Sequence, residues 1–496
     1  MTDTAIESTK RAAGPKRHRW IAAGIILAVI VVLVACDDVN NVVRPDEPVV
    51  FTGAELPTLV GTAPDRIVAF AHSRPNSTPT WTQIPVQVDE RKVVDFGQQP
   101  SNNSSPGADG TVYGTSPIGV TALQYADANT FVGPDNNSAF DADDELVFMS
   151  DDGGGTPRAS ERTEPAGVVP GSGVRVQLED SLDENKRGWV FLFISDGSID
   201  PSAGRDYVEY DFDLTSGPYK TSYKRADGPN PETSLVTTAN YRVGFDDRWI
   251  EDEWRVDAGD ATGVDVLDGV KARFSLTTCG RSNVTFADAE GAFVANIDGP
   301  VRAIRSYIGA NSGPLTQRTH LLYRDHERTV TDLRVHAIPG IMDFVDYSSA
   351  AIGMSYANSV HPGGVAVDGS ADAITTGLPS WELVSGAQGS LMVAGQVETS
   401  IIPSGGTLDD IVDGFYADQL NSPVQQCWGD AHFLGASGLT FVTGIPNTDP
   451  DLGTPATLHA TRLVRFAPPG ATTADVETWA NGVDTPLART LASYAP

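Results

Sequence analysis

The sequence is poor in cysteine, in histidine and in positive charge. Its 496 residues include three cysteines, eight histidines, and 34 Lys and Arg against 65 Asp and Glu. The formal net charge of −31 disfavours nucleic acid as a partner, because phosphate binding relies on clustered Lys and Arg. Acidity of this kind aids solubility and can recruit cations, although it can equally reflect the composition of the organism.

Several catalytic signatures are also missing. The sequence has no Gly-x-Ser-x-Gly, His-Glu-x-x-His, Walker A or paired Cys-x-x-Cys pattern. These absences remove the commonest hydrolase, zinc-protease and nucleotide-binding motifs. No repeat of fixed period is present, so a propeller or solenoid is not supported.

The N-terminus has the layout of a secretory signal peptide. A basic segment containing Lys10 and Arg19 precedes an unbroken apolar run from Trp20 to Ala35. This run is shorter than the roughly 20 apolar residues that span a bilayer. Removing residues 1–35, with their five basic and two acidic residues, changes the formal charge from −31 to −34.

Leu33-Val34-Ala35-Cys36 resembles the lipobox of bacterial lipoproteins. The resemblance implies cleavage before Cys36, lipidation of its thiol and anchoring to a bacterial membrane. The alternative is an uncleaved signal anchor with a chance cysteine. Both alternatives place residues 37–496 outside the cytoplasm, with residues 36–50 as a polar tether.

Lipidation of Cys36 would leave Cys279 and Cys427 as the remaining thiols. An even pair in an oxidising compartment favours one disulfide. It would close a long loop, worth about 4–5 kcal/mol in the chain-entropy model. Two separate buried thiols are the alternative.

The exported part is expected to be mainly β. Short runs rich in Val, Ile, Phe and Tyr alternate with clusters of Gly, Pro, Asn, Asp and Ser, which favours an antiparallel β-sandwich or supersandwich with few short helices. Ser/Thr-x-x-acid patterns predict helices beginning at Thr407 and Thr472. The length indicates two domains, which we place at 51–226 and 227–496.

Two acidic segments are candidate sites. Asp141, Asp143, Asp144 and Asp151 flank a short apolar run and offer the hard oxygen ligands that calcium takes, although the spacing is not that of an EF-hand. A solvated pair of turns is the alternative. The second segment, 246–253, places carboxylates between Trp249 and Trp254. That pattern suits a glycosidase if the tryptophans are exposed, and an edge strand or turn if they are buried.

Residues 302–336 carry a local excess of Arg and His. If 318–326 is extended, Arg318, His320, Arg324 and His326 share one face. Guanidinium groups bind carboxylates in pairs of hydrogen bonds, so this face predicts an anionic carbohydrate ligand, with His320 or Tyr323 as a base. Internal pairing with Asp and Glu is the alternative. The residues assigned to ligand binding are Arg302, Arg305, Arg318 and His326, and those assigned to catalysis are His320, Tyr323 and Arg324.

Trp381 to Ser400, together with Gly299 to Arg302, resembles the β-supersandwich domains of carbohydrate-active proteins. The resemblance covers about two hundred residues and implies no catalytic residue. The sequence therefore predicts a lipid-anchored extracytoplasmic protein that binds carbohydrate or another extracellular polymer. A polysaccharide lyase or hydrolase and a structural surface protein are the alternatives.

Overall fold

The computed structural model describes most of the chain beyond the expected tether. The described residues are 44, 46–95, 121–216, 230–275, 282, 291–309, 316–333, 340–375, 377–402, 404–419, 433–442 and 457–495. Cys36, Cys279 and Cys427 lie outside them, so lipidation and the disulfide stay predictions. Among the described residues, no helix is long and apolar enough to cross a membrane.

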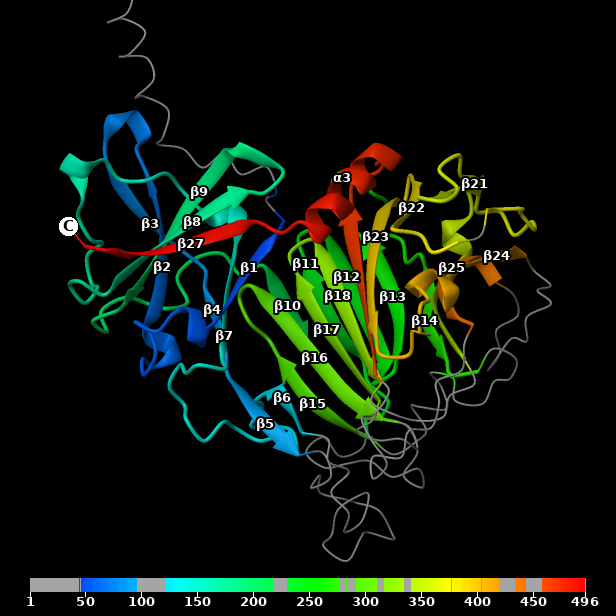
Figure 1. Ribbon diagram of the computed structural model, residues 1–496, viewed down its shortest axis with the longest axis horizontal. Coiled ribbons are helices and arrows are strands. Elements are labelled where there is room, and N and C mark those ends of the chain that lie inside the picture. Colours follow the sequence, from blue (N-terminus) through cyan, green and yellow to red (C-terminus); the bar gives the residue numbers. More distant parts are fainter. Residues whose placement is uncertain are drawn as a thin grey trace, which may run out of the picture.

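The protein is mainly β, as the sequence predicts, and every sheet is antiparallel (Figure 1). The first part of the chain builds three sheets. A five-stranded sheet has the order β27 (Ala488–Tyr494), β8 (Gly173–Asp180), β9 (Asp183–Ile194), β2 (Ile67–Ser73), β3 (Thr80–Ile84). A three-stranded sheet is β1 (Pro48–Thr52), β7 (Glu145–Met149), β4 (Gln87–Asp89), and a two-stranded sheet is β5 (Arg91–Asp95), β6 (Thr121–Tyr125).

A nine-stranded sheet dominates the rest of the chain. Its order is β15 (Gly291–Ile297), β16 (Arg302–Gly309), β17 (Thr316–Tyr323), β18 (His326–Leu333), β26 (Leu458–Ala467), β23 (Gly389–Thr399), β22 (Trp381–Gly386), β20 (Ser355–Asn358), β21 (Val365–Ala366). Two four-stranded sheets accompany it. One is β10 (Val208–Asp211), β11 (Ser234–Thr238), β12 (Tyr241–Asp247), β13 (Ile250–Val256), and the other is β14 (Leu267–Arg273), β19 (Ile341–Tyr347), β25 (Phe433–Phe441), β24 (Val412–Gln419).

Helical structure is sparse in the described residues. The one α-helix is α3 (Thr473–Asp484), in which Thr472 accepts from the Asp475 amide in a capping box, as the sequence predicts. The single-turn 3₁₀ helices are η1 (Gly53–Glu55), η2 (Pro64–Arg66), η3 (Pro75–Ser77), η5 (Ser150–Asp152), η6 (Ala159–Glu161), η9 (Ser349–Ala351) and η10 (Leu408–Asp410). The helix expected from Thr407 is wrong, because the chain makes only η10 and then enters β24.

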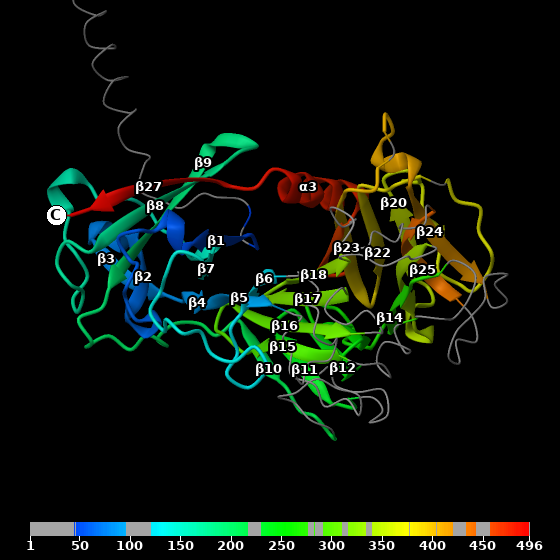
Figure 2. The same ribbon diagram turned by 60° about the horizontal axis from the view of Figure 1, so that its bottom comes forward.

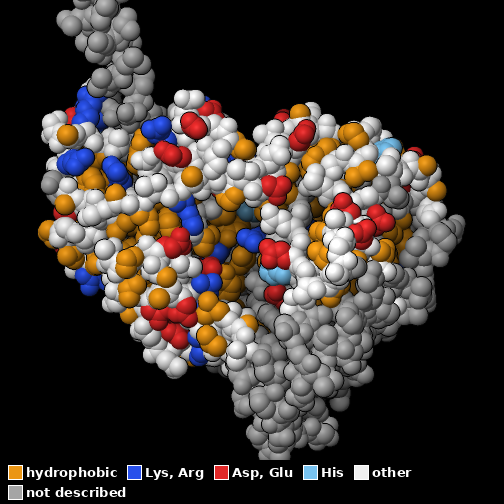
Figure 3. Space-filling view, in the orientation of Figure 1, with side chains coloured by type: hydrophobic (Ala, Val, Ile, Leu, Met, Phe, Trp, Pro, Cys, Tyr) orange, Lys and Arg blue, Asp and Glu red, His pale blue; other side chains and the backbone are white. Residues whose placement is uncertain are grey.

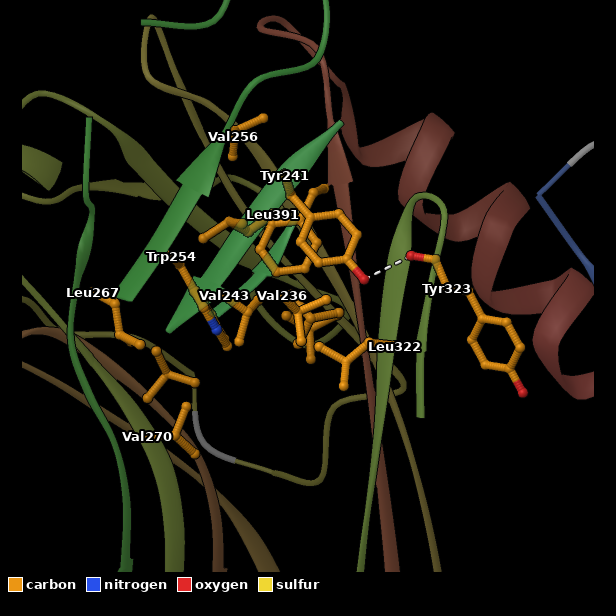
Figure 4. Close-up of a cluster of buried hydrophobic side chains, with 14 of the residues drawn as sticks. Val236, Tyr241, Val243, Trp254, Val256, Leu267, Val270, Leu322, Tyr323 and Leu391 are labelled. Carbon is orange, nitrogen blue, oxygen red and sulfur yellow. Dashed lines mark hydrogen bonds between the residues drawn. The ribbon is translucent and has the colours of Figure 1, made fainter. Parts of the chain in front are cut away.

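The nine-stranded sheet packs on the two four-stranded sheets through what we call its inner face. Figure 4 shows Val236, Tyr241 and Trp254 from β11–β13 gathered with Leu322 of β17 and Leu391 of β23. The Tyr241 hydroxyl, inside this core, donates to the Tyr323 carbonyl at 2.6 Å. Removing apolar surface from water stabilises the folded state by roughly 25 cal/mol per Å². The burial of apolar side chains from both layers therefore holds the layers together.

The opposite, outer face is covered only in part. The helix α3 packs Val476 and Ala480 against Trp381, Met392 and Ala394 of β22 and β23. The β5–β6 hairpin covers the other end of the sheet, over β15 and β16. Figure 2 shows the nine-stranded sheet between these coverings and the four-stranded sheets.

Two strand pairings cross the expected domain boundary at 226/227. The strand β10, which precedes this boundary, pairs with β11, which follows the boundary. At the end of the chain, β27 returns to pair with β8 in the five-stranded sheet. Arg44 reinforces this return by donating to the carbonyls of Gly482 and Thr485. Both ends of the described chain therefore meet beside the five-stranded sheet.

Candidate functional site

Ionisable and polar side chains form a band across the inner face, between the sheets. Strand register places Arg305 and Tyr307 of β16 beside His320 and Arg318 of β17. The same face continues through neighbouring strands with Glu327, Thr329, Arg462 and Glu382. Glu251 of β13, Asp343 of β19 and Glu232, which lies just before β11, face these residues. We call these residues the polar band.

One end of the polar band is a closed ion pair. Arg305 donates to both oxygens of Glu232, at 2.8 and 2.6 Å, and both side chains are fully buried. The guanidinium carbon also lies 4.1 Å from the Phe245 ring centre. Burial alone would lower the pKa of Arg305, but the Glu232 carboxylate reverses this and raises it. Both terminal nitrogens of Arg305 and both oxygens of Glu232 are therefore engaged with each other.

The middle of the band joins two carboxyls to one imidazole. His320 Nδ1 lies 2.5 Å from Glu327 Oε1 and 3.6 Å from Glu251 Oε2, while His320 Nε2 lies 2.8 Å from the Tyr307 hydroxyl. Burial, and then the Glu327 carboxylate, raise the pKa of Glu251 to about 8. Burial also lowers the pKa of His320 to about 3. At neutral pH Glu251 therefore holds a proton and His320 is uncharged.

The other end of the band is charged. Arg462 Nη2 donates to Asp343 Oδ1 at 2.5 Å, and Arg318 Nη2 lies 3.5 Å from the same oxygen. Burial alone would raise the pKa of Asp343, but these two guanidiniums lower it below its ordinary value. Glu382 differs, because burial raises its pKa; its Oε2 accepts from the Tyr356 hydroxyl at 3.1 Å. The pKa values of these two carboxyls are therefore shifted in opposite directions.

A cavity of about 240 Å³ opens at this charged end. Asp343, Glu382 and Arg462 lie at its polar side. Its walls are mostly apolar and come from β23, β25, η10 and the loop before β22, namely Val393, Val397, Leu439, Leu408, Leu378 and Pro379. We call this cavity the pocket. Apolar walls with a few convergent polar groups are typical of small-molecule sites.

The residues predicted from sequence divide between the two faces. Arg305, Arg318 and His320 lie in the polar band. Arg302 and Tyr323 lie on the outer face instead, where Arg302 donates to Asp89 and Glu145 at 2.7 and 2.5 Å. His326, also on that face, stacks on Tyr323 with ring centres 4.8 Å apart.

The expected single face through 318–326 is wrong. Residues 324 and 325 form the turn between β17 and β18, so the alternation stops at Tyr323. Arg324 lies in that turn and donates to Asp151 at 2.8 Å. Tyr323 and Arg324 therefore do not join His320 in one constellation. Sequence reasoning also missed the pocket residues Asp343, Glu382 and Arg462.

The outer face carries a second polar region. Figure 3 shows that this side of the molecule is hollowed near its middle and that Arg, Asp, Glu and His side chains gather there. Register places Arg328, Asp332 and His459 on this face. His459 Nδ1 lies 2.8 Å from Asp332, and this hydrogen bond raises the pKa of His459.

The acidic segments are positioned differently from each other. Asp141, Asp143 and Asp144 come together, but Asp151 pairs with Arg324. Asp144 already accepts from the amides of Asp141 and Arg91, so calcium at this group stays a prediction. The second segment forms the β12–β13 hairpin.

Trp249 and Trp254 are each about 1% exposed, in agreement with the buried alternative. The same hairpin delivers Glu251 to the polar band. Since Glu251, His320 and Glu327 each place one ligand atom within 4.8 Å of the others, they are the described residues best placed to hold a metal ion besides the aspartate group.

Comparison with known proteins identifies no family. No family model and no curated protein matches the chain. Among solved structures, a protein of Escherichia coli K12 assigned as an aldose 1-epimerase aligns with 52% of this chain and 100% of its own, at 9% identity and a TM-score of 0.24. A superposition this loose carries no argument, so the pocket itself must carry the functional conclusion.

Proposed function

We propose that the pocket binds one unit of a neutral carbohydrate, and that the protein does so outside the cytoplasm, anchored to a bacterial membrane by a lipid on Cys36. The observation that carries the proposal is the pairing of the charges at the pocket. Arg462 is paired with Asp343, and burial raises the pKa of Glu382. A pocket whose charged groups are engaged with each other, and whose hydrogen-bonding groups lie at one side, suits a polyhydroxyl ligand better than an anion.

The size and walls of the pocket support the same ligand class. A volume of about 240 Å³ lies below the roughly 300–1,000 Å³ typical of drug-sized ligands, so one small unit fits. A sugar ring has apolar C–H surfaces, which Val393, Val397 and Leu439 would contact. Glu382 would donate to a hydroxyl, and Asp343 would accept from one.

The pairing of the arginines weakens the anionic alternative. Arg302, Arg305 and Arg324 each have a carboxylate partner, and Arg318 shares Asp343 with Arg462. Removing such a guanidinium from its partner to serve a ligand would leave a carboxylate uncompensated, at a cost of several kcal/mol when buried. An acidic glycan is therefore the comparison that the experiment must include.

A second candidate function is acid–base catalysis on the bound sugar. The pKa values of Glu382 and Asp343 are pushed in opposite directions, upward by burial and downward by the arginines respectively. Two carboxyls with opposed shifts are what a general acid and a general base or nucleophile require. In this reading Glu382 donates a proton and Asp343 acts as the anion.

The test is a glycan array with neutral and acidic members, probed with the full-length protein, followed by calorimetry on the best ligand. We expect neutral glycans to bind and Glu382→Leu, which removes the donor, to weaken binding at least tenfold. Arg465→Met is a control, because Arg465 lies on β26 like Arg462 but on the outer face, paired with Asp46. Binding of acidic glycans alone, or equal binding by folded Glu382→Leu, would overturn the proposal. Release of a shortened sugar from the bound glycan would establish the catalytic candidate.

The anchor has its own test. Membrane fractionation of cells expressing the full-length protein should place it with membranes, and Cys36→Ala should release it or leave an unprocessed precursor. Intact-mass analysis should show acyl mass on a chain that begins at Cys36. A mature chain without added mass would contradict lipidation and leave the pocket proposal unaffected.

A further inference from the structure

We propose that Glu251, His320 and Glu327 hold one divalent transition-metal ion, Zn²⁺ or Mn²⁺, between the two layers of the fold. One ligand atom from each residue lies within 4.8 Å of the others. Glu251 comes from β13 of a four-stranded sheet, whereas His320 and Glu327 come from the adjacent strands β17 and β18 of the nine-stranded sheet. The ion would therefore join the layers. This proposal does not depend on the function of the pocket.

Two orphaned oxygens point to a missing partner. Glu251 Oε2 and Glu327 Oε2 are fully buried and accept from no donor of another described residue, so without an ion the two carboxyls have only a proton held between them. The side chains of Glu251, Glu327 and His320 are at most 3% exposed, so bulk solvent does not reach them. A buried carboxylate oxygen left without a donor is destabilising. A cation between the two carboxylates would satisfy both oxygens.

The surrounding hydrogen bonds already hold the ligands in place. The Trp254 indole N–H donates to Glu251 Oε1, and the Thr329 hydroxyl donates to Glu327 Oε1 at 3.0 Å. The Tyr307 hydroxyl lies 2.8 Å from His320 Nε2, so Nε2–H can donate to it and leave Nδ1 for the ion. Outer partners of this kind orient metal ligands and fix the imidazole tautomer.

The ligand set selects the class of ion. One imidazole nitrogen and two carboxylate oxygens suit Zn²⁺ or Mn²⁺, whereas Ca²⁺ takes six to eight oxygens. Once the ion has displaced the proton on Glu251, the two ionised carboxylates neutralise its divalent charge. The competitor for the site is a proton, since His320 Nδ1 and Glu327 Oε1 are now 2.5 Å apart. Tetrahedral ligands on zinc lie roughly 3.3 Å apart, so ion binding would widen this pair by about 1 Å and displace the proton.

The experiment measures metal content and metal-dependent stability of the full-length protein. After growth with added Zn²⁺ or Mn²⁺ and exhaustive dialysis, we expect about one ion per chain by elemental analysis. Chelator treatment should lower the melting temperature, and the metal alone should restore it. Glu251→Gln should reduce metal affinity at least tenfold, while Asp141→Asn, in the aspartate group, should leave it unchanged.

A second measurement covers the chance that Glu251→Gln fails to fold. Co²⁺ added to the chelated wild-type protein should give the visible absorption bands of a low-symmetry protein site, and Zn²⁺ should bleach them. A folded wild-type protein that retains no ion, shows no melting shift with either metal and gives no Co²⁺ bands overturns the proposal. In that case the three residues share a proton only. Loss of the ion in Asp141→Asn would also overturn it, because it would assign the metal to the aspartate group.

Discussion

Arg462 of β26 and Asp343 of β19 face each other across the two layers, 2.5 Å apart between Nη2 and Oδ1. Neither strand neighbours the other in any sheet. The contact therefore ties the nine-stranded sheet to a four-stranded sheet, and it does so at the polar side of the pocket. The affinity of any ligand that hydrogen-bonds to this pair would therefore depend on the spacing of the two layers.

The first prediction concerns the pH dependence of sugar binding. Burial raises the pKa of Glu382, and the arginines lower that of Asp343. Binding should weaken as pH rises through the Glu382 pKa, because the carboxyl loses its donor proton. It should also weaken as pH falls through the low Asp343 pKa. Calorimetry across pH should show both limbs, and Glu382→Gln should abolish the upper one; a flat profile would contradict this reading.

The second prediction concerns the buried pair Arg305 and Glu232. Arg305→Met should destabilise the protein by about 3–5 kcal/mol, because Glu232 would stay buried without a counter-charge. The double variant Arg305→Met/Glu232→Leu should recover much of that loss. Urea unfolding measures both values. A single-variant cost below about 1 kcal/mol would show that the pair is not desolvated.

The third prediction concerns Asp346, which lies 3.0 Å from Lys271 and is almost fully buried. Burial raises the pKa of Asp346 from 3.8 to about 6. The folded state then holds the proton more tightly than the unfolded state. Its contribution to stability is complete below pH 3.8 and is lost as pH rises through about 6.

A shift of this size corresponds to about 3 kcal/mol, at 1.36 kcal/mol per pKa unit. Asp346→Asn should flatten the stability profile between pH 4 and pH 7, measured by denaturant unfolding at each pH. An unchanged slope in this window would mean that other groups dominate it.

The fourth prediction concerns the start of α3. Thr472→Ala should cost about 1 kcal/mol, because it removes the acceptor for the Asp475 amide. Thr478→Ala is the control, since Thr478 is exposed in the middle of the helix and bonds only back to the Ala474 carbonyl. Thermal unfolding should separate the two variants, and an equal effect would contradict a capping role.

The fold class could be predicted from the sequence because strand and turn signals are local. The capping signal at Thr472 is also local, and the helix that it predicts is present as α3. The same pattern at Thr407 did not produce a helix, because Val412–Gln419 pairs with β25 and sheet pairing overrides a weak capping preference.

The candidate site was only partly predictable. Alternation correctly placed Arg318 and His320 on one face, but it could not foresee the turn at Arg324. Asp343, Glu382 and Arg462 lie on three strands far apart in sequence. Their proximity depends on the tertiary fold and cannot be predicted from local sequence patterns. A usable signal did exist, because each is a charged residue inside a strand of mainly buried residues. A charge in such a strand must find a partner or a ligand.

The pairing of β27 with β8 has a consequence for biosynthesis. The edge of β8 stays open until residues 488–494 have left the ribosome, so the first sheet of the chain is the last to be completed. Open strand edges are sites of wrong association between chains. A nascent chain, or a chain truncated before residue 488, should therefore depend on chaperones because β27 is not there to cover this edge.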